Sequence, residues 1–205
     1  YVNEASESGF MKHFSTHSVS AADFDNDMDM DLYFIAQTSV GNAKNLYYDN
    51  LGDGSFSLVK GAGSASGSKV GVGDGVALAD YNEDGFIDIL TTNGFGPDVF
   101  AWMGESHLYK NLGHTNNWLE IDLIGKQSNY HGVGATIYLT TPDSKVQHRF
   151  QNGGMHHRGQ NYQRIHFGLA KNETANLKIY WPNGEVQNLK NVMANQIIKA
   201  IEPTL

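Results

Sequence analysis

Residues 23–31 read Asp-Phe-Asp-Asn-Asp-Met-Asp-Met-Asp, so that a carboxylate stands at every second position of the stretch. Carboxylates this close repel one another, and a bound cation removes that repulsion. Residues 80–88 repeat the pattern as Asp-Tyr-Asn-Glu-Asp-Gly-Phe-Ile-Asp. Both stretches fit D-x-[DN]-x-D-x-x-x-D, a spacing that directs side-chain oxygens and one backbone carbonyl towards a hard cation with about six to eight oxygen ligands.

We therefore predict two calcium sites; the alternative is a pair of solvated acidic turns without metal. The predicted ligands are Asp23, Asp25, Asp27, Asp31 and the carbonyl of Asp29 in the first site, and Asp80, Asn82, Asp84, Asp88 and the carbonyl of Phe86 in the second. An EF-hand would need flanking helices and a Glu at the twelfth loop position, where this chain has Phe34 and Thr91. The flanking runs are apolar and β-like, which predicts a calcium-dependent β protein.

The charge of the chain is concentrated in these two stretches. The 205 residues include 22 acidic and 14 basic residues, giving a net charge of −8. Nine acids lie within the two stretches, and the remaining 13 nearly balance the 14 bases. Because no basic run or basic region occurs, nucleic acid is not an expected partner.

The composition also indicates where in or outside the cell the protein is located. The chain has no cysteine, so disulfides cannot hold the fold together, and extracellular calcium would take that role. No apolar stretch approaches the roughly 18 residues that cross a bilayer, so membrane insertion is not expected. We expect a secreted, periplasmic or cell-surface protein. The start at Tyr1, without an initiator Met or signal peptide, suggests an excised or processed part of a longer protein.

A longer unit contains each acidic stretch. A Leu-Tyr strand that ends at an Asn-x-Gly turn follows each of them, at residues 45–56 and 107–113, which gives a period near that of propeller blades. The second copy carries an inserted Gly- and aromatic-rich loop near residues 94–105. From residue 117 the pattern changes to alternating strands and an Asn-Gly hairpin. We expect a repeat region at 1–116 and a β domain at 117–205, with Trp118 and Trp181 in the core.

These motifs resemble two known families in tandem. The blocks at residues 22–27 and 79–85, with their trailing Leu-Tyr strands, are similar to the FG-GAP/VCBS repeat. Residues 117–203 resemble the ASPIC/UnbV domain through Asn117-Trp-Leu, Gly132-Val-Gly-Ala, Gly159-Gln-Asn, Arg164-Ile-His-Phe-Gly-Leu and Trp181-Pro-Asn-Gly. The resemblance implies secretion or surface display, calcium-binding propeller blades and a recognition role, and it implies no particular chemistry.

The fold expected from both arguments is all-β, with propeller-blade-like calcium-binding repeats packed on a C-terminal antiparallel β domain. Two repeats cannot close a propeller, so either further blades precede Tyr1 or the two units pack directly on the C-terminal domain. Met28 stands where the repeat usually has Gly, which predicts a strained turn in the first loop.

Two loops are candidate ligand sites. Aromatic side chains of the insertion could stack on a pyranose ring, and polar groups near Gly159 could bind sugar hydroxyls or an acidic group. The predicted ligand-binding residues are Phe100, Trp102, His156, His157, Arg158, Gln160 and Tyr162. The structural alternatives are that the aromatic residues fill a domain junction and that the polar loop contacts its own domain. A transition-metal site at His156 and His157 is disfavoured, because adjacent strand residues point to opposite faces.

Catalysis has weak support in the sequence. A polysaccharide lyase could use Tyr130, His131 or Tyr162 as acid and base, with Arg158 neutralising a uronate. However, no G-x-S-x-G or H-E-x-x-H motif occurs, and the clustered carboxylates are assigned to metal. We expect a non-catalytic extracellular recognition module that binds calcium and a polysaccharide or glycan. A protein partner, in adhesion or in a larger surface protein, is the alternative, and a polysaccharide-degrading enzyme is third.

Overall fold

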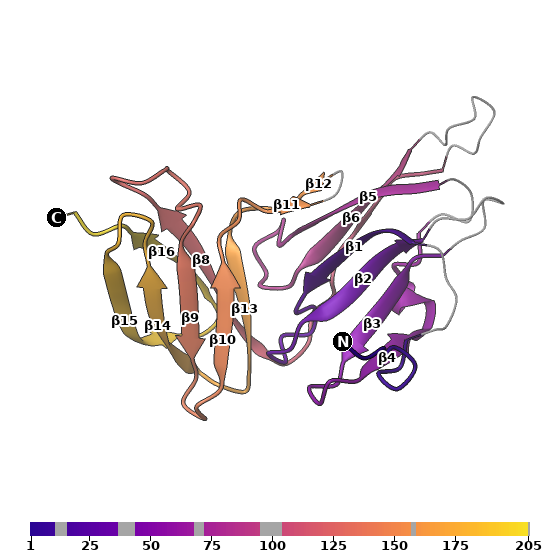
Figure 1. Cartoon of the computed structure of the whole chain (residues 1–205), viewed down its shortest axis with the longest axis horizontal. Helices are drawn as coiled ribbons and strands as arrows, with labels where there is room; N and C mark the ends of the chain where they lie inside the picture. The colour runs from indigo at the N-terminus through magenta and orange to yellow at the C-terminus, as the bar shows by residue number, and fades with distance from the viewer. Residues whose placement is uncertain (11–15, 37–43, 68–71, 95–103, 157–158, 205) are drawn as a thin grey trace.

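The computed structural model describes residues 1–10, 16–36, 44–67, 72–94, 104–156 and 159–204. Nearly all regular structure in these residues is β-strand, which confirms the predicted fold class. Figure 1 shows two groups of sheets side by side, with β1–β6 in one and β8–β10 and β13–β16 in the other, and with β11 and β12 reaching between them towards β5. No helix long and apolar enough to span a bilayer occurs in the described part of the chain.

Each repeat forms one antiparallel sheet, and its acidic loop joins the first two strands. The first sheet has the order β1-β2-β3-β4 and is followed by a short 3₁₀ turn at Lys60–Ser64, and the second has the order β5-β6-β7. The strands are β1 Thr16–Ala22, β2 Asp31–Ala36, β3 Leu46–Asn50, β4 Phe56–Val59, β5 Val72–Ala79, β6 Asp88–Gly94 and β7 His107–Tyr109.

The two repeat sheets enclose one core, in which a face of the first sheet packs against the non-equivalent face of the second. We call this arrangement head-to-tail packing. Tyr33 and Ile35 of the first repeat meet Val76, Leu78 and Ile89 of the second in this core. At the 57-residue offset between the acidic loops, the counterpart of Tyr33 is Leu90, which is 42% exposed. The first repeat therefore buries a face whose equivalent in the second repeat is open.

The C-terminal residues form two sheets that enclose a second core. One sheet has the order β10-β9-β14-β15 and the other β13-β8-β16, with a two-stranded ribbon β11-β12 beside them. The strands are β8 Asn117–Ile124, β9 Thr136–Thr140, β10 Val146–Phe150, β11 Met155–His156, β12 Gly159–Gln160, β13 Ile165–Ala170, β14 Thr174–Tyr180, β15 Val186–Met193 and β16 Gln196–Ile201. Alternating apolar residues of β8, β9, β13 and β14 fill the space between the sheets.

One pairing departs from the antiparallel arrangement that the sequence predicted. β16 runs parallel to β8, with Gln196 opposite Leu119 and Ile201 opposite Ile124. The physical reason is the connection: β15 lies in the other sheet, so the chain crosses between sheets and enters beside β8 in the same direction.

The two tryptophans expected in the core differ in their positions. Trp181 is 3% exposed inside the C-terminal core. Trp118 instead packs on the second acidic loop, where a Cβ added to Gly85 would lie 1.9 Å from the indole ring. Gly85 also has φ +85°, a conformation that favours glycine. The core prediction was therefore wrong for Trp118, because β8 begins at the contact between the two units.

Replacing Gly85 with Ala should test this contact. We expect Gly85→Ala to lower the unfolding free energy by about 2–5 kcal/mol, through its left-handed φ and the clash with Trp118. Gly54→Ala is the matched control, since Gly54 has φ +89° but no atom within 4 Å of an added Cβ. Its expected loss is about 1–2 kcal/mol. Equal losses in urea unfolding would contradict the Trp118 contact.

The last strand is fixed by a buried carboxylate. Glu202 is 2% exposed and accepts backbone hydrogen bonds from Lys126, Gln127 and Ser128 at 2.6–2.9 Å, and one from the Ser128 hydroxyl. Desolvation opposes its ionised form, but these hydrogen bonds outweigh it and lower the pKa of Glu202 to about 2. The carboxylate therefore ties the C-terminal end of β16 to the loop after β8.

This shift predicts a pH-dependent contribution to stability. A depressed carboxyl pKa stabilises the fold above the unfolded-state pKa of roughly 4.3, and the contribution is lost as the pH falls towards 2. Unfolding of the wild type and Glu202→Gln should therefore differ most above pH 5 and converge near pH 2. A difference that does not change with pH would contradict the ionised carboxylate.

Candidate functional site

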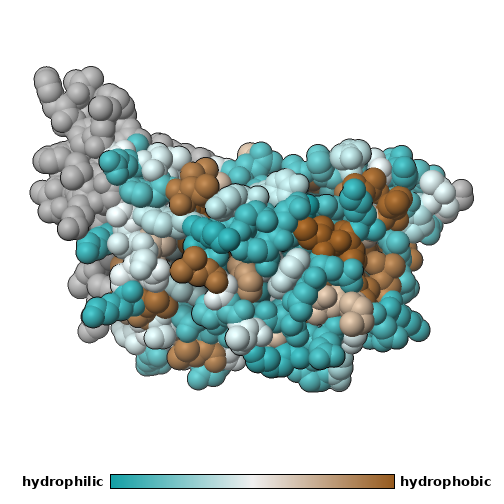
Figure 2. Space-filling model, turned by 180° about the vertical axis from the view of Figure 1, so that it is seen from behind, coloured by the Kyte–Doolittle hydropathy of each residue, from teal (hydrophilic) through white to brown (hydrophobic). Residues whose placement is uncertain are grey.

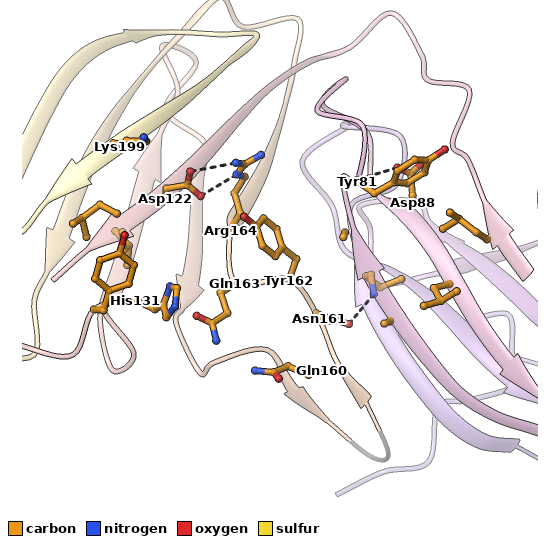
Figure 3. Close-up of a pocket in the computed structure, with 18 residues that line it drawn as sticks. Tyr81, Asp88, Asp122, His131, Gln160, Asn161, Tyr162, Gln163, Arg164 and Lys199 are labelled. Atoms are coloured by element: carbon orange, nitrogen blue, oxygen red, sulfur yellow. Dashed lines mark hydrogen bonds and ion pairs between the residues drawn. The ribbon is translucent and has the colours of Figure 1, made fainter. Parts of the chain in front are cut away.

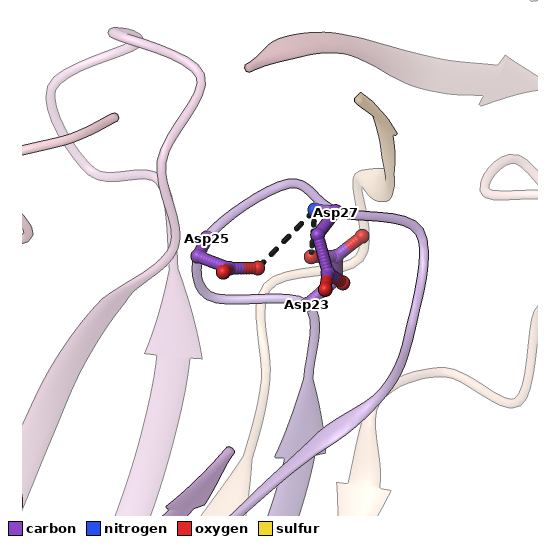
Figure 4. Close-up of side chains that lie close together, drawn as sticks. All are labelled: Asp23, Asp25 and Asp27. Atoms are coloured by element: carbon purple, nitrogen blue, oxygen red, sulfur yellow. Dashed lines mark hydrogen bonds between the residues drawn. The ribbon is translucent and has the colours of Figure 1, made fainter. Parts of the chain in front are cut away.

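Three carboxylates of the first acidic loop lie together. Single oxygen atoms of Asp23, Asp25 and Asp27 all lie within 4.8 Å of one another. Figure 4 shows the loop curling so that these side chains point into the same space. Asp23 is 1% exposed, and Asp25 and Asp27 are half-buried.

Backbone N–H groups hold the loop in this shape. The two carboxylate oxygens of Asp23 accept hydrogen bonds from the N–H groups of Asp27 and Met28 at 3.0 and 2.9 Å. In the second loop Asp80 accepts from Asp84 and Gly85 in the same way. Met28 adopts φ +88°, close to the +85° of its counterpart Gly85. The strained turn predicted at Met28 is therefore present, and both loops share one backbone conformation.

The last carboxylate of each loop binds the Asn-x-Gly turn of its own repeat. Asp31 Oδ1 accepts a hydrogen bond from Asn50 N at 2.8 Å, and Asp88 Oδ1 accepts one from Asn111 N at 2.7 Å. The second oxygens accept from Phe24 N and Tyr81 N respectively. The loop and the following turn thus form one hydrogen-bonded unit that occurs twice.

The second loop carries less uncompensated charge than the first. Lys110 Nζ lies 3.1 Å from Asp84 Oδ2, and the Asn82 amide donates to the same oxygen at 2.7 Å. Asn82 is exposed, whereas Asp80 and Asp88 are buried. The two loops therefore share geometry and differ in electrostatics.

The donor chemistry of the first loop fits a hard cation. Burial raises the pKa of Asp23 to about 8 and that of Asp31 to about 7, and neighbouring carboxylates add to both shifts. Among the described residues, no Lys, Arg or His forms an ion pair with Asp23, Asp25 or Asp27. Lys145 and Arg149 act on Asp27 and Asp23 only from beyond ion-pair distance. Clustered, half-buried carboxylates without a cation in direct contact are destabilising, and calcium would supply that charge.

Sequence reasoning did not identify Asp49 as a neighbour of this site. Asp49 belongs to β3, and its pKa is raised by desolvation and then by the nearby carboxylate of Asp27. The two residues are 22 positions apart in the sequence, and the pairing of β2 with β3 brings the strand of Asp49 towards the loop that carries Asp27.

Both acidic loops also form the contact with the C-terminal domain. Ala170 N of this domain donates to the carbonyl of Asn26 at 2.8 Å, and the amide of Asn116, in the segment that leads into β8, donates to the carbonyl of Asp25 at 2.9 Å. A Cβ added to Gly168 would lie 2.1 Å from Asp23 Oδ2, so β13 packs directly against the first loop. The predicted metal loops therefore lie at the contact between the two units, with residues 81–83 of the second loop exposed.

The second loop meets the C-terminal domain through His166 and Arg164. His166 Nε2 lies 3.1 Å from the carbonyl of Gly85, and burial lowers the pKa of this histidine to about 4, so the neutral ring donates to that carbonyl. The Arg164 guanidinium binds Asp122 through two nitrogens at 2.9 and 3.2 Å, and it also contacts Glu83 and Glu120. The sequence contained these residues within a family motif, but their role depends on the facing loop.

A cleft of about 860 Å³ lies beside this contact, between β5–β7 and the C-terminal domain. Figure 3 shows Tyr81 and Asp88 on the repeat side, with His131 and Lys199 on the opposite side and Tyr162 between them. Asn161 Oδ1 accepts from Leu78 N at 2.9 Å, and Tyr162 N donates to the Leu78 carbonyl at 3.0 Å. The 160–164 segment thus forms the floor that joins the two walls.

The predicted ligand-binding residues are only partly placed by this geometry. Gln160 and Tyr162 both line the cleft, with Tyr162 56% exposed. Phe100, Trp102, His157 and Arg158 lie outside the described residues, and of His156 only its place in β11 is described. Tyr130 and His131, considered for catalysis, also line the cleft, with ring centroids 4.9 Å apart.

Comparison with known proteins finds one family match within each unit. Residues 23–91 match the FG-GAP-like repeat, and residues 125–204 match the family described as ASPIC and UnbV. The chain thus carries an FG-GAP-like repeat followed by an ASPIC/UnbV domain, as its motifs indicated.

Similar proteins include cartilage acidic protein 1 from several animals. The Homo sapiens protein is 25% identical over 193 residues, which cover 91% of this chain and 28% of that protein. The Xenopus tropicalis protein is 29% identical over 175 residues (82% and 26%), and the Mus musculus protein is 26% identical over 201 residues (93% and 30%). The chain spans less than a third of the length of these relatives.

Proposed function

We propose that this pairing of an FG-GAP-like repeat with an ASPIC/UnbV domain is a non-catalytic, extracellular recognition module that binds calcium at two loops and a carbohydrate between its units. The acidic loop enclosed at the contact between the two units is the observation that carries the calcium part. The resemblance to cartilage acidic protein 1 supports an extracellular location.

Calcium in this proposal has a structural role. Asp23, Asp25, Asp27 and Asp31 would hold one ion, and Asp80, Asn82, Asp84 and Asp88 the other, with carbonyls from Asp29 and Phe86. An ion that binds the native state and not the unfolded chain adds about 2.7 kcal/mol of stability at a concentration 100 times its Kd. Because both loops contact the C-terminal domain, the ions would stabilise the attachment of the two units as well as each loop.

Alanine substitutions test the structural ions. Asp27→Ala and Asp84→Ala should lower the melting temperature by several degrees in millimolar calcium, because each removes a ligand. In EDTA the effect of Asp27→Ala should be near zero, since the variant also removes repulsion within a crowded loop. Asp53→Ala, at an exposed turn outside both loops, serves as the control. Equal losses with and without calcium would contradict the proposal.

The proposal of a non-catalytic role rests on how the charged residues of the cleft are used. Arg164 is occupied by three carboxylates, and Asp88 is bound to the Asn111 turn. Tyr130 and His131 contact one another edge to face on an exposed loop. A lyase would need a base shielded from solvent at the substrate position, and the exposed Tyr130 and His131 support binding better than proton transfer.

A carbohydrate is the ligand that the lining of the cleft supports best. Tyr81, Tyr130 and Tyr162 are each at least 51% exposed and line the same cleft as side-chain amides. Ligand sites of this size combine apolar surface with a few polar groups. The rival, a protein adhesion surface, would favour a broad apolar patch. Figure 2 shows the hydrophobic residues of the viewed face as separate small patches among hydrophilic ones.

Affinity electrophoresis in a panel of polymers tests the carbohydrate proposal. The panel contains a soluble β-glucan, a galactomannan and a xylan as neutral polymers, alginate as a uronic polymer and chondroitin sulfate as a sulfated one. We expect selective retardation by at least one polymer in calcium and weaker retardation in EDTA. If no polymer retards the protein while calcium still raises its melting temperature, the carbohydrate proposal is wrong and a protein partner takes its place.

A further inference from the structure

The cleft between the units has two chemically different walls. The repeat wall presents Leu90, Leu108 and Tyr81, which are 42%, 55% and 51% exposed. The opposite wall, from the C-terminal domain, presents Tyr130 at 66% exposure together with Lys199. A ligand that fills the cleft therefore meets an apolar surface on one side and mixed aromatic and polar groups on the other.

We propose that a neutral oligosaccharide occupies this cleft and bridges the two units, so that ligand binding and the calcium-dependent attachment of the units are linked. The inference rests on the proposed function and deepens it by naming the site and the ligand class. A pyranose ring has apolar C–H faces and a polar rim, which matches stacking on Tyr81 or Tyr130 and hydrogen bonds from the segment between the walls.

Unused hydrogen-bonding groups support a hydroxyl-rich ligand. Gln163 lines the cleft, and its Oε1 is buried without a hydrogen-bond partner among the described residues. Such an acceptor is destabilising until a donor reaches it. Lys199 also lines the cleft and has neither an ion pair nor a hydrogen bond within the described chain. Lys199 is thus an unused donor at the surface of the cleft, whereas Gln163 Oε1 would reach a sugar hydroxyl only if this side chain moved.

The charge balance favours a neutral sugar over an acidic one. Arg164 lies at the cleft, but its guanidinium faces Asp122, Glu83 and Glu120, which together carry more charge than it neutralises. Lys199 contributes the other positive charge, so that Arg164 and Lys199 together are balanced by Glu83 and Asp122. No surplus of positive charge remains to compensate a uronate or sulfate ester, and desolvating an anion there would be unfavourable.

A further repeat sheet is the competing occupant. Leu90 and Ala79 are the 57-residue counterparts of Tyr33 and Ala22, which in the first repeat are buried against the second. Another sheet could therefore cover the repeat wall by the same head-to-tail packing. The floor and the facing wall argue against this occupant, because the Gln160 and Gln163 amides of the floor and Lys199 of the facing wall would lie against an apolar sheet face.

Saccharide binding is linked to calcium binding because the two walls of the cleft belong to different units. Tyr81 is the second residue of the second acidic loop, and Asp88 is its last. Tyr130 and Lys199 belong to the other unit. A saccharide that contacts both walls binds best when the units are attached, so calcium should tighten saccharide binding, and saccharide should tighten calcium binding by the same factor.

The test applies the neutral polymers of the panel, alginate and chondroitin sulfate to the full 205-residue chain and to variants of each wall. Tyr81→Ala and Tyr130→Ala should each weaken binding of a neutral polymer about tenfold, as expected for aromatic residues at the centre of a binding site. Lys199→Gln retains a donor and should change it less than about threefold. Tyr138→Ala, an exposed tyrosine of β9 away from the cleft, should leave it unchanged. Each variant must keep its calcium-dependent rise in melting temperature, which shows that the loops are intact.

The alternatives give different results. Neutral-polymer binding that neither tyrosine variant weakens would leave the proposed function in place and overturn the cleft as its site. Retardation only by alginate or chondroitin sulfate, abolished by Lys199→Gln or by added salt, would overturn the neutral class. If the wild-type chain self-associates or binds a protein, and Leu108→Asp abolishes that association while Tyr130→Ala leaves it unchanged, the repeat wall would be assigned to another sheet. No retardation by any polymer would overturn the proposed function itself.

Discussion

Crowded, partly buried carboxylates are the constraint on which the rest of this structure depends. Asp23 and Asp31 are almost inaccessible to solvent, and burial together with their neighbours raises the pKa of both. The chain compensates part of this unfavourable charge itself, by directing backbone N–H groups at the first and last carboxylate of each loop. The remainder calls for a cation, which is why the acidic loops carry the proposed function.

Those compact loops also supply the surface on which the two units meet. Backbone carbonyls of Asn26 and Gly85 face the C-terminal domain and accept hydrogen bonds from Ala170 and His166. Small residues allow this approach, since side chains at Gly85 or Gly168 would overlap Trp118 or the first loop. A change in either loop therefore affects the contact between the two units. The loops are sequence motifs of the repeat, and they also form the joint, meaning the surface at which the two units are attached.

The cleft is a consequence of this joint and of the head-to-tail packing of the repeats. The repeats bury one face of the first sheet and leave the equivalent face of the second open. The C-terminal domain stands opposite that open face, attached through Arg164, His166 and Asn161. The open face of the second repeat sheet thus becomes one wall of the cleft.

The β class, the two repeats and their family could be predicted from the sequence, because they depend on local patterns: alternating apolar residues, the spacing of acids and the Asn-x-Gly turns. The spacing also selected the candidate ligands, since side-chain oxygens at positions 1, 3, 5 and 9 of one loop can converge on one cation. Contacts between residues that are far apart in the sequence became visible only in the tertiary structure. It placed Trp118 on Gly85, Asp49 near Asp27, β16 parallel to β8 and Tyr81 across from Tyr130. Such contacts depend on how sheets pack, and packing is set by the shape of complete faces, which no short stretch of sequence contains.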